Sequence, residues 1–135
     1  MQPLIAYLGT AIVFFAIDFV WLAFIAKTFY AQQLGPLMRE SPNLTVAAVF
    51  YVVYVVGVVV FAVMPAVRAE SWATALALGA LLGLVAYGTY DATNLATLKN
   101  WPTIVSVVDV IWGTALTAVS ATAGYFFVRL LTSGG

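Results

Sequence analysis

The sequence contains no cysteine and no histidine, and it has few charged residues. Without these two residue types the chain cannot by itself form disulfides, thiolate nucleophiles, iron–sulfur clusters or the usual haem and zinc sites. Charged residues occupy 7% of its 135 positions, whereas a soluble domain has about 25%. Five basic and five acidic residues cancel, which leaves no net charge to attract nucleic acid. We therefore expect neither a typical soluble enzyme nor a nucleic-acid-binding protein.

Apolar residues are correspondingly abundant. They make up 64% of the chain, and the mean hydropathy is +1.08. A run of about 20 apolar residues can cross the hydrocarbon core of a bilayer as a helix. Four such runs cover most of the sequence, at residues 4–26, 44–66, 72–95 and 103–130. We predict an all-α, multi-pass membrane protein in which residues 1–135 form a single domain, a bundle of four transmembrane helices.

Three aspartates interrupt these runs toward one side of the membrane. The first and third helices run in one direction and the fourth in the other, so Asp18, Asp91 and Asp109 each lie about 10–14 Å from the same face. Only fourteen apolar residues, 4–17, precede Asp18, so this residue must lie within its span, whereas the other two can also be placed at the headgroup border. An aspartate at mid-span costs about 2.5–3.5 kcal/mol and usually faces the bundle interior. We expect the three acids to form one polar layer.

Hydrogen-bonding and aromatic side chains accompany the aspartates. The candidate residues for binding a proton or ligand are Asp18, Asp91, Asp109, Asn94, Thr93, Tyr87, Tyr90, Trp21 and Trp112. Acids that cluster without internal bases favour protonation, because desolvation and mutual repulsion disfavour the charged forms. Two structural alternatives stay open: the acids are neutral packing groups, or Lys27, Arg39 or Lys99 reaches in to pair with them.

Small residues recur at helical spacing on the third and fourth helices, on the faces that carry the acids. Glycines four residues apart let helix backbones approach closely, and small hydroxyl residues hydrogen-bond between helices. The predicted helix-packing residues are Gly79, Gly83, Gly113, Thr117, Ser120 and Gly124. We therefore expect the packing face and the polar layer to be one surface.

The second helix and the connection before it are expected to play smaller parts. The second helix has a stripe of Phe50, Tyr54, Gly57 and Phe61 and no charge, and we expect this helix to seal the bundle against lipid rather than to do chemistry. The connection at residues 28–40 has apolar residues at helical spacing, so it could lie along the membrane surface as a linker or a lid.

A short pattern of apolar-Asp-apolar-apolar-Trp occurs twice, at residues 17–21 and 108–112. The two copies lie on helices of opposite direction. Inverted repeats with a binding site at their interface are a recurring feature of transporters. Tryptophan is also an ordinary anchor at the membrane border, so five residues are weak evidence for a repeat.

Several motifs together resemble a known family. They are Asp18-x-x-Trp21-Leu22, Phe29-Tyr30, the run Tyr87-Gly88-Thr89-Tyr90-Asp91-Ala92-Thr93-Asn94-Leu95-Ala96-Thr97-Leu98, Trp101-Pro102 and Asp109-x-x-Trp112-Gly113. Over nearly the whole chain, the sequence resembles a family of short bacterial inner-membrane proteins known as domain of unknown function 2177. The resemblance implies a four-helix, multi-pass protein of the bacterial inner membrane, and it implies no reaction, ligand or partner.

Three functions stay open, of which we place a small proton- or cation-linked transporter first. The second is an accessory or assembly subunit of a membrane complex, or a lipid-binding membrane protein. The third is a lipid-modifying enzyme, for which oxygen-only ligands would favour Mg²⁺, Ca²⁺ or Mn²⁺. We expect no catalytic residue, no cofactor and no nucleic-acid partner. The expected partners are the lipid bilayer and either a second copy of the chain or a membrane complex.

Overall fold

Short helical segments join into four continuous helices. The computed structural model describes residues 1–35 and 44–132. The segments are α1 (Gln2–Val20), η1 (Trp21–Ala26), α2 (Lys27–Leu34), α3 (Leu44–Val58), η3 (Val59–Val63), α4 (Met64–Ala69), α5 (Trp72–Thr97) and α6 (Thr103–Thr132). The segments η1 and η3 are π-helical turns, which are wider than α-helical turns and leave the helix unbroken.

Four helices in the described residues are long and apolar enough to cross a membrane. They cover Gln2–Ala26, Thr45–Ala69, Trp72–Thr97 and Thr103–Thr132. These ranges match the four runs expected from hydropathy to within three residues at every end. The prediction of an all-helical, four-span architecture is confirmed.

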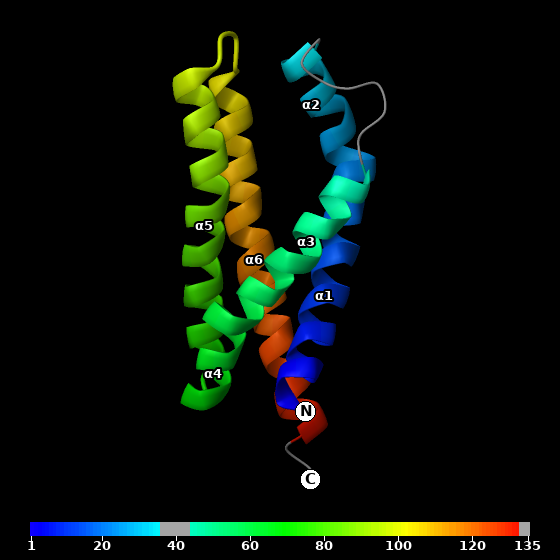
Figure 1. Cartoon of the computed structure of the whole chain (residues 1–135), viewed down its shortest axis with the longest axis vertical. Helices are drawn as coiled ribbons and strands as arrows, with labels where there is room; N and C mark the ends of the chain where they lie inside the picture. Colours follow the sequence, from blue (N-terminus) through cyan, green and yellow to red (C-terminus); the bar gives the residue numbers. More distant parts are fainter. Residues whose placement is uncertain (36–43, 133–135) are drawn as a thin grey trace.

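Helix α6 is the centre of the bundle. Helices α5 and α6 run antiparallel, side by side along their lengths, and α1 also packs against α6 (Figure 1). Helix α3 crosses obliquely, and its continuation η3 contacts α1, α5 and α6. Helix α1 begins and α6 ends at the same end of the bundle, whereas α2 and the turn between α5 and α6 lie at the other end (Figure 1).

The first helix is longer than the sequence suggested. We expected it to end at residue 26 and residues 28–40 to form a surface connection, but the chain continues through η1 into α2 as far as Leu34. Helix α2 continues from the end of α1 but runs at an angle to it (Figure 1). Gly35 ends the helix with a φ of 51°, a left-handed value that glycine tolerates. The rest of the expected linker or lid, residues 36–40, lies outside the described residues.

Large apolar side chains face outward as well as inward. The core between α1, α3, η3 and α6 contains Phe14, Val55 and Leu116, all nearly inaccessible. On the outside, Phe24 and Ile111 are 77% and 64% exposed. So much apolar surface is unfavourable in water and is what a lipid environment solvates.

Glycines set the separation of α5 and α6. A Cβ atom on Gly83 would collide with the carbonyl oxygen of Gly113, and one on Gly79 would lie 2.9 Å from the carbonyl oxygen of Thr117. In both cases the obstacle is backbone, which cannot rotate aside. This close approach holds the polar residues of α5 and α6 against each other.

Candidate functional site

The carboxyl group of Asp109 on α6 is the centre of the polar layer. The hydroxyl of Tyr30 on α2 donates a hydrogen bond to Asp109 Oδ1 at 2.9 Å. The carboxyl groups of Asp18 and Asp91 are both close enough to interact electrostatically with that of Asp109. The structure thus brings together three acids from α1, α5 and α6, with the carboxyl group of Asp109 within electrostatic range of each of the others.

Asp18 is held by a tryptophan of another helix. The indole Nε1 of Trp112 donates to Asp18 Oδ1 at 3.2 Å, and Asp18 is only 6% exposed. The ring of Trp112 also stacks on that of Trp21, with centroids 4.3 Å apart and planes 10° from parallel. The two Asp-x-x-Trp patterns of the sequence therefore meet: their tryptophans stack, and the acid of the first copy accepts from the tryptophan of the second.

Asp91 is the most buried of the three acids. It is 1% exposed, and its Oδ2 atom has no hydrogen-bond partner among the described residues. Its backbone is fixed by a short relay in which Trp101 Nε1 donates to Ser106 Oγ, and Ser106 Oγ donates to the carbonyl oxygen of Asp91, each at 3.0 Å. The Asp91 carbonyl is thus hydrogen-bonded, whereas Oδ2 of its carboxyl group, which lies near Asp109, has no partner in the described part of the chain.

Tyr30 is a site residue that the sequence did not reveal. Burial, together with the neighbouring carboxyl of Asp109, raises the pKa of Tyr30 above its ordinary value. The neutral phenol is therefore favoured, and the hydroxyl stays a donor to Asp109. Sequence reasoning placed Tyr30 in the surface connection, since Lys27 marked the expected end of the helix; its place in the Phe29-Tyr30 motif was the only pointer.

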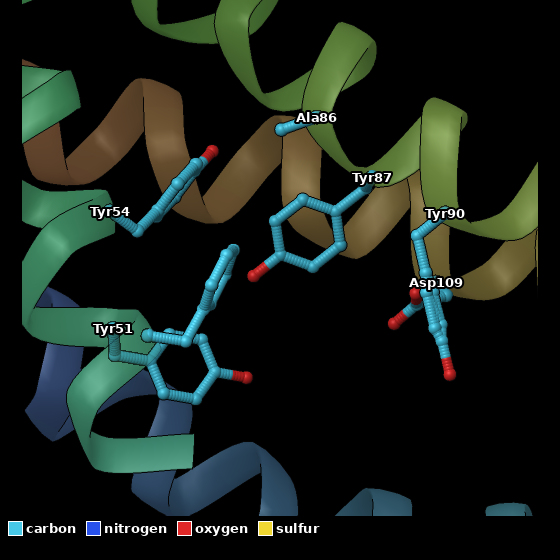
Figure 2. Close-up of a pocket in the computed structure, with 7 residues that line it drawn as sticks. Tyr51, Tyr54, Ala86, Tyr87, Tyr90 and Asp109 are labelled. Atoms are coloured by element: carbon cyan, nitrogen blue, oxygen red, sulfur yellow. The ribbon is translucent and has the colours of Figure 1, made fainter. Parts of the chain in front are cut away.

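A cavity of about 510 Å³ opens beside Asp109. Apart from Asp109 and Ala86, its lining is aromatic: Phe50, Tyr51, Tyr54, Tyr87 and Tyr90. The hydroxyl of Tyr51 and the carboxyl oxygens of Asp109 point from opposite sides into the same open space, and the Tyr87 hydroxyl points there as well (Figure 2). The cavity thus lies between α3, α5 and α6.

The second helix therefore contributes more than a seal against lipid. Phe61 is 65% exposed, as a sealing residue would be. Tyr51 and Tyr54, however, face the cavity, and Tyr54 forms a 2.9 Å hydrogen bond with the hydroxyl of Thr117. The sequence gave no indication of a role for Tyr51.

The remaining candidates on α5 divide into two groups. Tyr87 and Tyr90 line the cavity, and the half-buried Asn94 lies beside Tyr90. Thr93 is exposed, and its hydroxyl donates to the Thr89 carbonyl of its own helix. The structure does not bring Thr93 to the acids.

The predicted helix-packing residues on α6 are all buried. The ring of Tyr87 lies against Gly113, and a Cβ on Gly124 would collide with the hydroxyl of Thr10 on α1. The Ser120 hydroxyl is buried without a hydrogen-bond partner in the described part of the chain. These residues lie where helices meet, on the same face of α6 as Asp109.

Basic residues do not neutralise the acids within the described residues. The ion pair found there joins Arg129 to Glu70 at 3.9 Å, at the opposite end of the bundle from α2. Lys99 is exposed and makes no ion pair with the three aspartates. Arg39 and the side chain of Lys27 lie outside what the structure describes. Among residues 1–35 and 44–132, no group of three or more acidic side chains is arranged to hold a metal ion.

Comparison with known proteins gives one match. A family model described as "Predicted membrane protein (DUF2177)" matches residues 3–126, which is nearly the whole chain. No curated protein and no solved structure matches the chain.

Proposed function

We propose, from the premise that the chain belongs to the DUF2177 family of predicted membrane proteins, that it is a small carrier linked to protons or other cations. The observation that supports this most is the position of Asp109, which adjoins two other acids and also borders the cavity. An acid in this position can take up a cation from the cavity or release it there. It also interacts electrostatically with the two buried acids, Asp18 and Asp91. We place this carrier in the bacterial inner membrane.

The energetics favour occupation of the acid cluster. Two carboxylates side by side in a low-dielectric interior repel each other strongly. Among the described side chains, no ion pair to these acids is found. A proton or cation between Asp91 and Asp109 removes that repulsion. Binding of one cation at Asp109 therefore changes whether Asp91 and Asp18 favour the protonated or the ionised form. A linked carrier requires such coupling between its binding groups.

Two neutral hydrogen-bond donors stabilise the acid cluster when no cation is bound. Tyr30 donates to Asp109 and Trp112 donates to Asp18, so two of the acids have a neutral partner when no cation is bound. Such donors lower the cost of a buried negative charge without competing as a full countercharge. A cation can then leave as well as enter.

The test is transport in liposomes that contain the purified protein and an internal pH-sensitive dye. A pH gradient is imposed with sodium, potassium or an organic ammonium ion outside, and its dissipation is compared with that in empty vesicles. We expect the parent to exceed empty vesicles with at least one cation, and Asp109→Asn and Asp18→Asn to fall to the empty-vesicle rate. Glu70→Gln is the matched control, because it also neutralises an acid but lies at the other end of the bundle.

Two outcomes would overturn the carrier. One is a parent that behaves like empty vesicles with every cation tested. The other is transport by Asp109→Asn at the parent rate, which would show that the acid cluster plays no part in it.

A further inference from the structure

The cavity has an unusual lining for a site next to three acids: five aromatic rings and one carboxyl group. Aromatic faces carry negative electrostatic potential and attract cations that approach within about 6 Å of the ring centre. Alkyl-substituted ammonium ions suit such a lining best, since they are weakly hydrated and their substituents also bury apolar surface.

We propose that this cavity binds an organic ammonium ion, with the rings of Tyr51, Tyr87 and Tyr90 around its alkyl groups and Asp109 as its countercharge. This deepens the proposed function, on which it rests, by naming the class of cation that the carrier takes. Binding, however, can be measured whether or not transport occurs.

The size and chemistry of the cavity favour an organic cation over a metal ion. Its volume, about 510 Å³, lies in the range of about 300–1,000 Å³ that holds small organic ligands. A divalent metal ion requires about six oxygen ligands, whereas Asp109 is the one carboxyl in this lining and the described residues contain no cluster of three metal-binding side chains. The aromatic rings have no oxygen ligands to add beyond weak phenols.

A neutral occupant, such as a lipid chain, fits less well. It would fill the aromatic part of the cavity and exclude water from Asp109, which would then face the ligand without a countercharge. An ammonium ion provides the apolar surface and the charge together. The Tyr51 and Tyr87 hydroxyls, which point into the space, can accept hydrogen bonds from water or from an ammonium N–H (Figure 2).

Neighbouring contacts hold the aromatic wall in place. The ring of Tyr54 is fixed through its bond to Thr117, stacks on Phe50 with centroids 6.1 Å apart, and meets Tyr87 edge to face at 6.2 Å. The ring of Tyr51 packs edge to face on Phe50 at 5.9 Å. A wall that is already ordered loses little conformational entropy when it binds a ligand.

The experiment measures binding of benzyltrimethylammonium by isothermal titration calorimetry to the full chain in phosphatidylglycerol nanodiscs. The uncharged comparator is 2-methyl-1-phenylpropan-2-ol, which has nearly the same shape. We expect saturable binding of the ammonium ion, weaker by at least about tenfold in Asp109→Asn and unchanged in Glu70→Gln. Asn keeps the shape of Asp and can still accept from Tyr30, so this change removes the charge alone.

The aromatic contribution is tested by paired substitutions. Tyr51→Leu is expected to weaken binding roughly 3- to 30-fold, whereas Tyr51→Phe keeps the ring and stays within about threefold of the parent. Circular dichroism checks that each variant is folded. If Tyr51→Leu does not fold, the same Leu and Phe pair at Tyr90, a cavity residue that is 51% exposed, provides the comparison.

The natural ammonium group can belong to a soluble cation or to a lipid headgroup. Adding phosphatidylcholine to the nanodiscs distinguishes the two sources. If the natural ligand is a lipid headgroup, phosphatidylcholine should weaken binding of the probe to the parent. It should not weaken the residual binding of the probe to Asp109→Asn. A soluble occupant predicts equal binding in both kinds of disc.

The proposal is overturned if no saturable binding is found, if the alcohol binds as tightly as the ammonium ion, or if Asp109→Asn binds with parent affinity. Its failure differs from failure of the carrier. Binding without transport would sustain the ammonium site and reject the carrier, whereas cation-linked transport without ammonium binding would do the reverse.

Discussion

The indole nitrogen of Trp112 donates a hydrogen bond to the carboxyl of Asp18, a residue 94 positions earlier in the chain, at 3.2 Å. This bond joins α1 to α6 within the polar layer, and the stacking of Trp112 on Trp21 supports it from the side. A donor from a stacked ring is held in a fixed direction. This pair therefore both joins α1 to α6 and fixes the position of the Asp18 carboxyl.

A double-mutant cycle tests this pair. Trp112→Phe keeps an aromatic ring but removes the donor, and Asp18→Ala removes the acceptor. We expect each change to lower the free energy of unfolding. The expected coupling between them is about 0.6 kcal/mol and at most about 1.7 kcal/mol, the average and the maximum for hydrogen bonds between membrane helices. Unfolding in a denaturing detergent, followed by circular dichroism, measures it. Strictly additive effects would mean that the bond contributes nothing.

Two glycines on α5 offer a matched comparison. Gly83→Ala places a methyl group against the backbone of α6, which cannot move without separating the helices, whereas a Cβ at Gly88 meets nothing within 4 Å. We expect Gly83→Ala to destabilise the protein by about 1–3 kcal/mol. Gly88→Ala should be neutral or stabilising by up to about 1 kcal/mol, because alanine favours helix. Equal stabilities of the two variants would contradict the close packing of α5 and α6.

The hydrogen bond between Tyr54 and Thr117 ties α3 to α6 at 2.9 Å. Tyr54→Phe removes it without removing the ring, and we expect a loss of about 0.6–1.7 kcal/mol in the free energy of unfolding. Tyr7→Phe is the control, because the Tyr7 hydroxyl donates to the Val52 carbonyl over a longer 3.4 Å at an exposed position. Its removal should cost much less, and a larger cost for Tyr7 than for Tyr54 would count against this account.

The phenol of Tyr30 should resist ionisation. Burial and the adjacent Asp109 raise its pKa, so the folded protein holds the proton at pH values where an ordinary tyrosine has lost it. Tyrosinate absorbance near 295 nm is compared between the parent and Tyr30→Phe. At about pH 10.5, where an ordinary tyrosine with a pKa of about 10 is mostly ionised, we expect no difference between the two. An excess of tyrosinate in the parent would show that Tyr30 is accessible to water.

The sign of the linked stability follows from the same pKa. Because folding raises the pKa of Tyr30, the folded state holds more protons than the unfolded state above about pH 10. Stability should therefore fall as the pH rises through and beyond that value. Tyr30→Phe should lose less stability over the same range than the parent does.

The spans and the acids could be predicted because the bilayer constrains both. Its thickness fixes the length of an apolar helix, and the direction of each helix places Asp18, Asp91 and Asp109 on one side. Helical spacing also placed Gly83 and Gly113 on the faces where their helices meet. These features depend on local sequence and on the known thickness of the bilayer.

The part of the aromatic wall that α3 contributes could not be predicted, for a physical reason. The helix at residues 44–66 is apolar all round, so its pattern does not indicate which face turns inward. Tyr51 and Tyr54 acquire their role from the oblique crossing of α3 over the other helices, which no periodicity in that helix encodes (Figure 1). The same limit applies to Tyr30, whose contact with Asp109 spans 79 residues of sequence.

The π-helical turn η1 determines which face of α2 is directed toward α6. An α-helix turns by about 100° for each residue, and a π-helical turn takes up one residue more than an α-helical turn. Rewinding Trp21–Ala26 as regular α-helix without removing a residue would therefore rotate α2 by about that angle. Tyr30 would then point away from Asp109 although every side chain of the site was still present. A chain with the same residues but a regular α-helix in place of this turn would thus share the composition of the site without sharing its geometry.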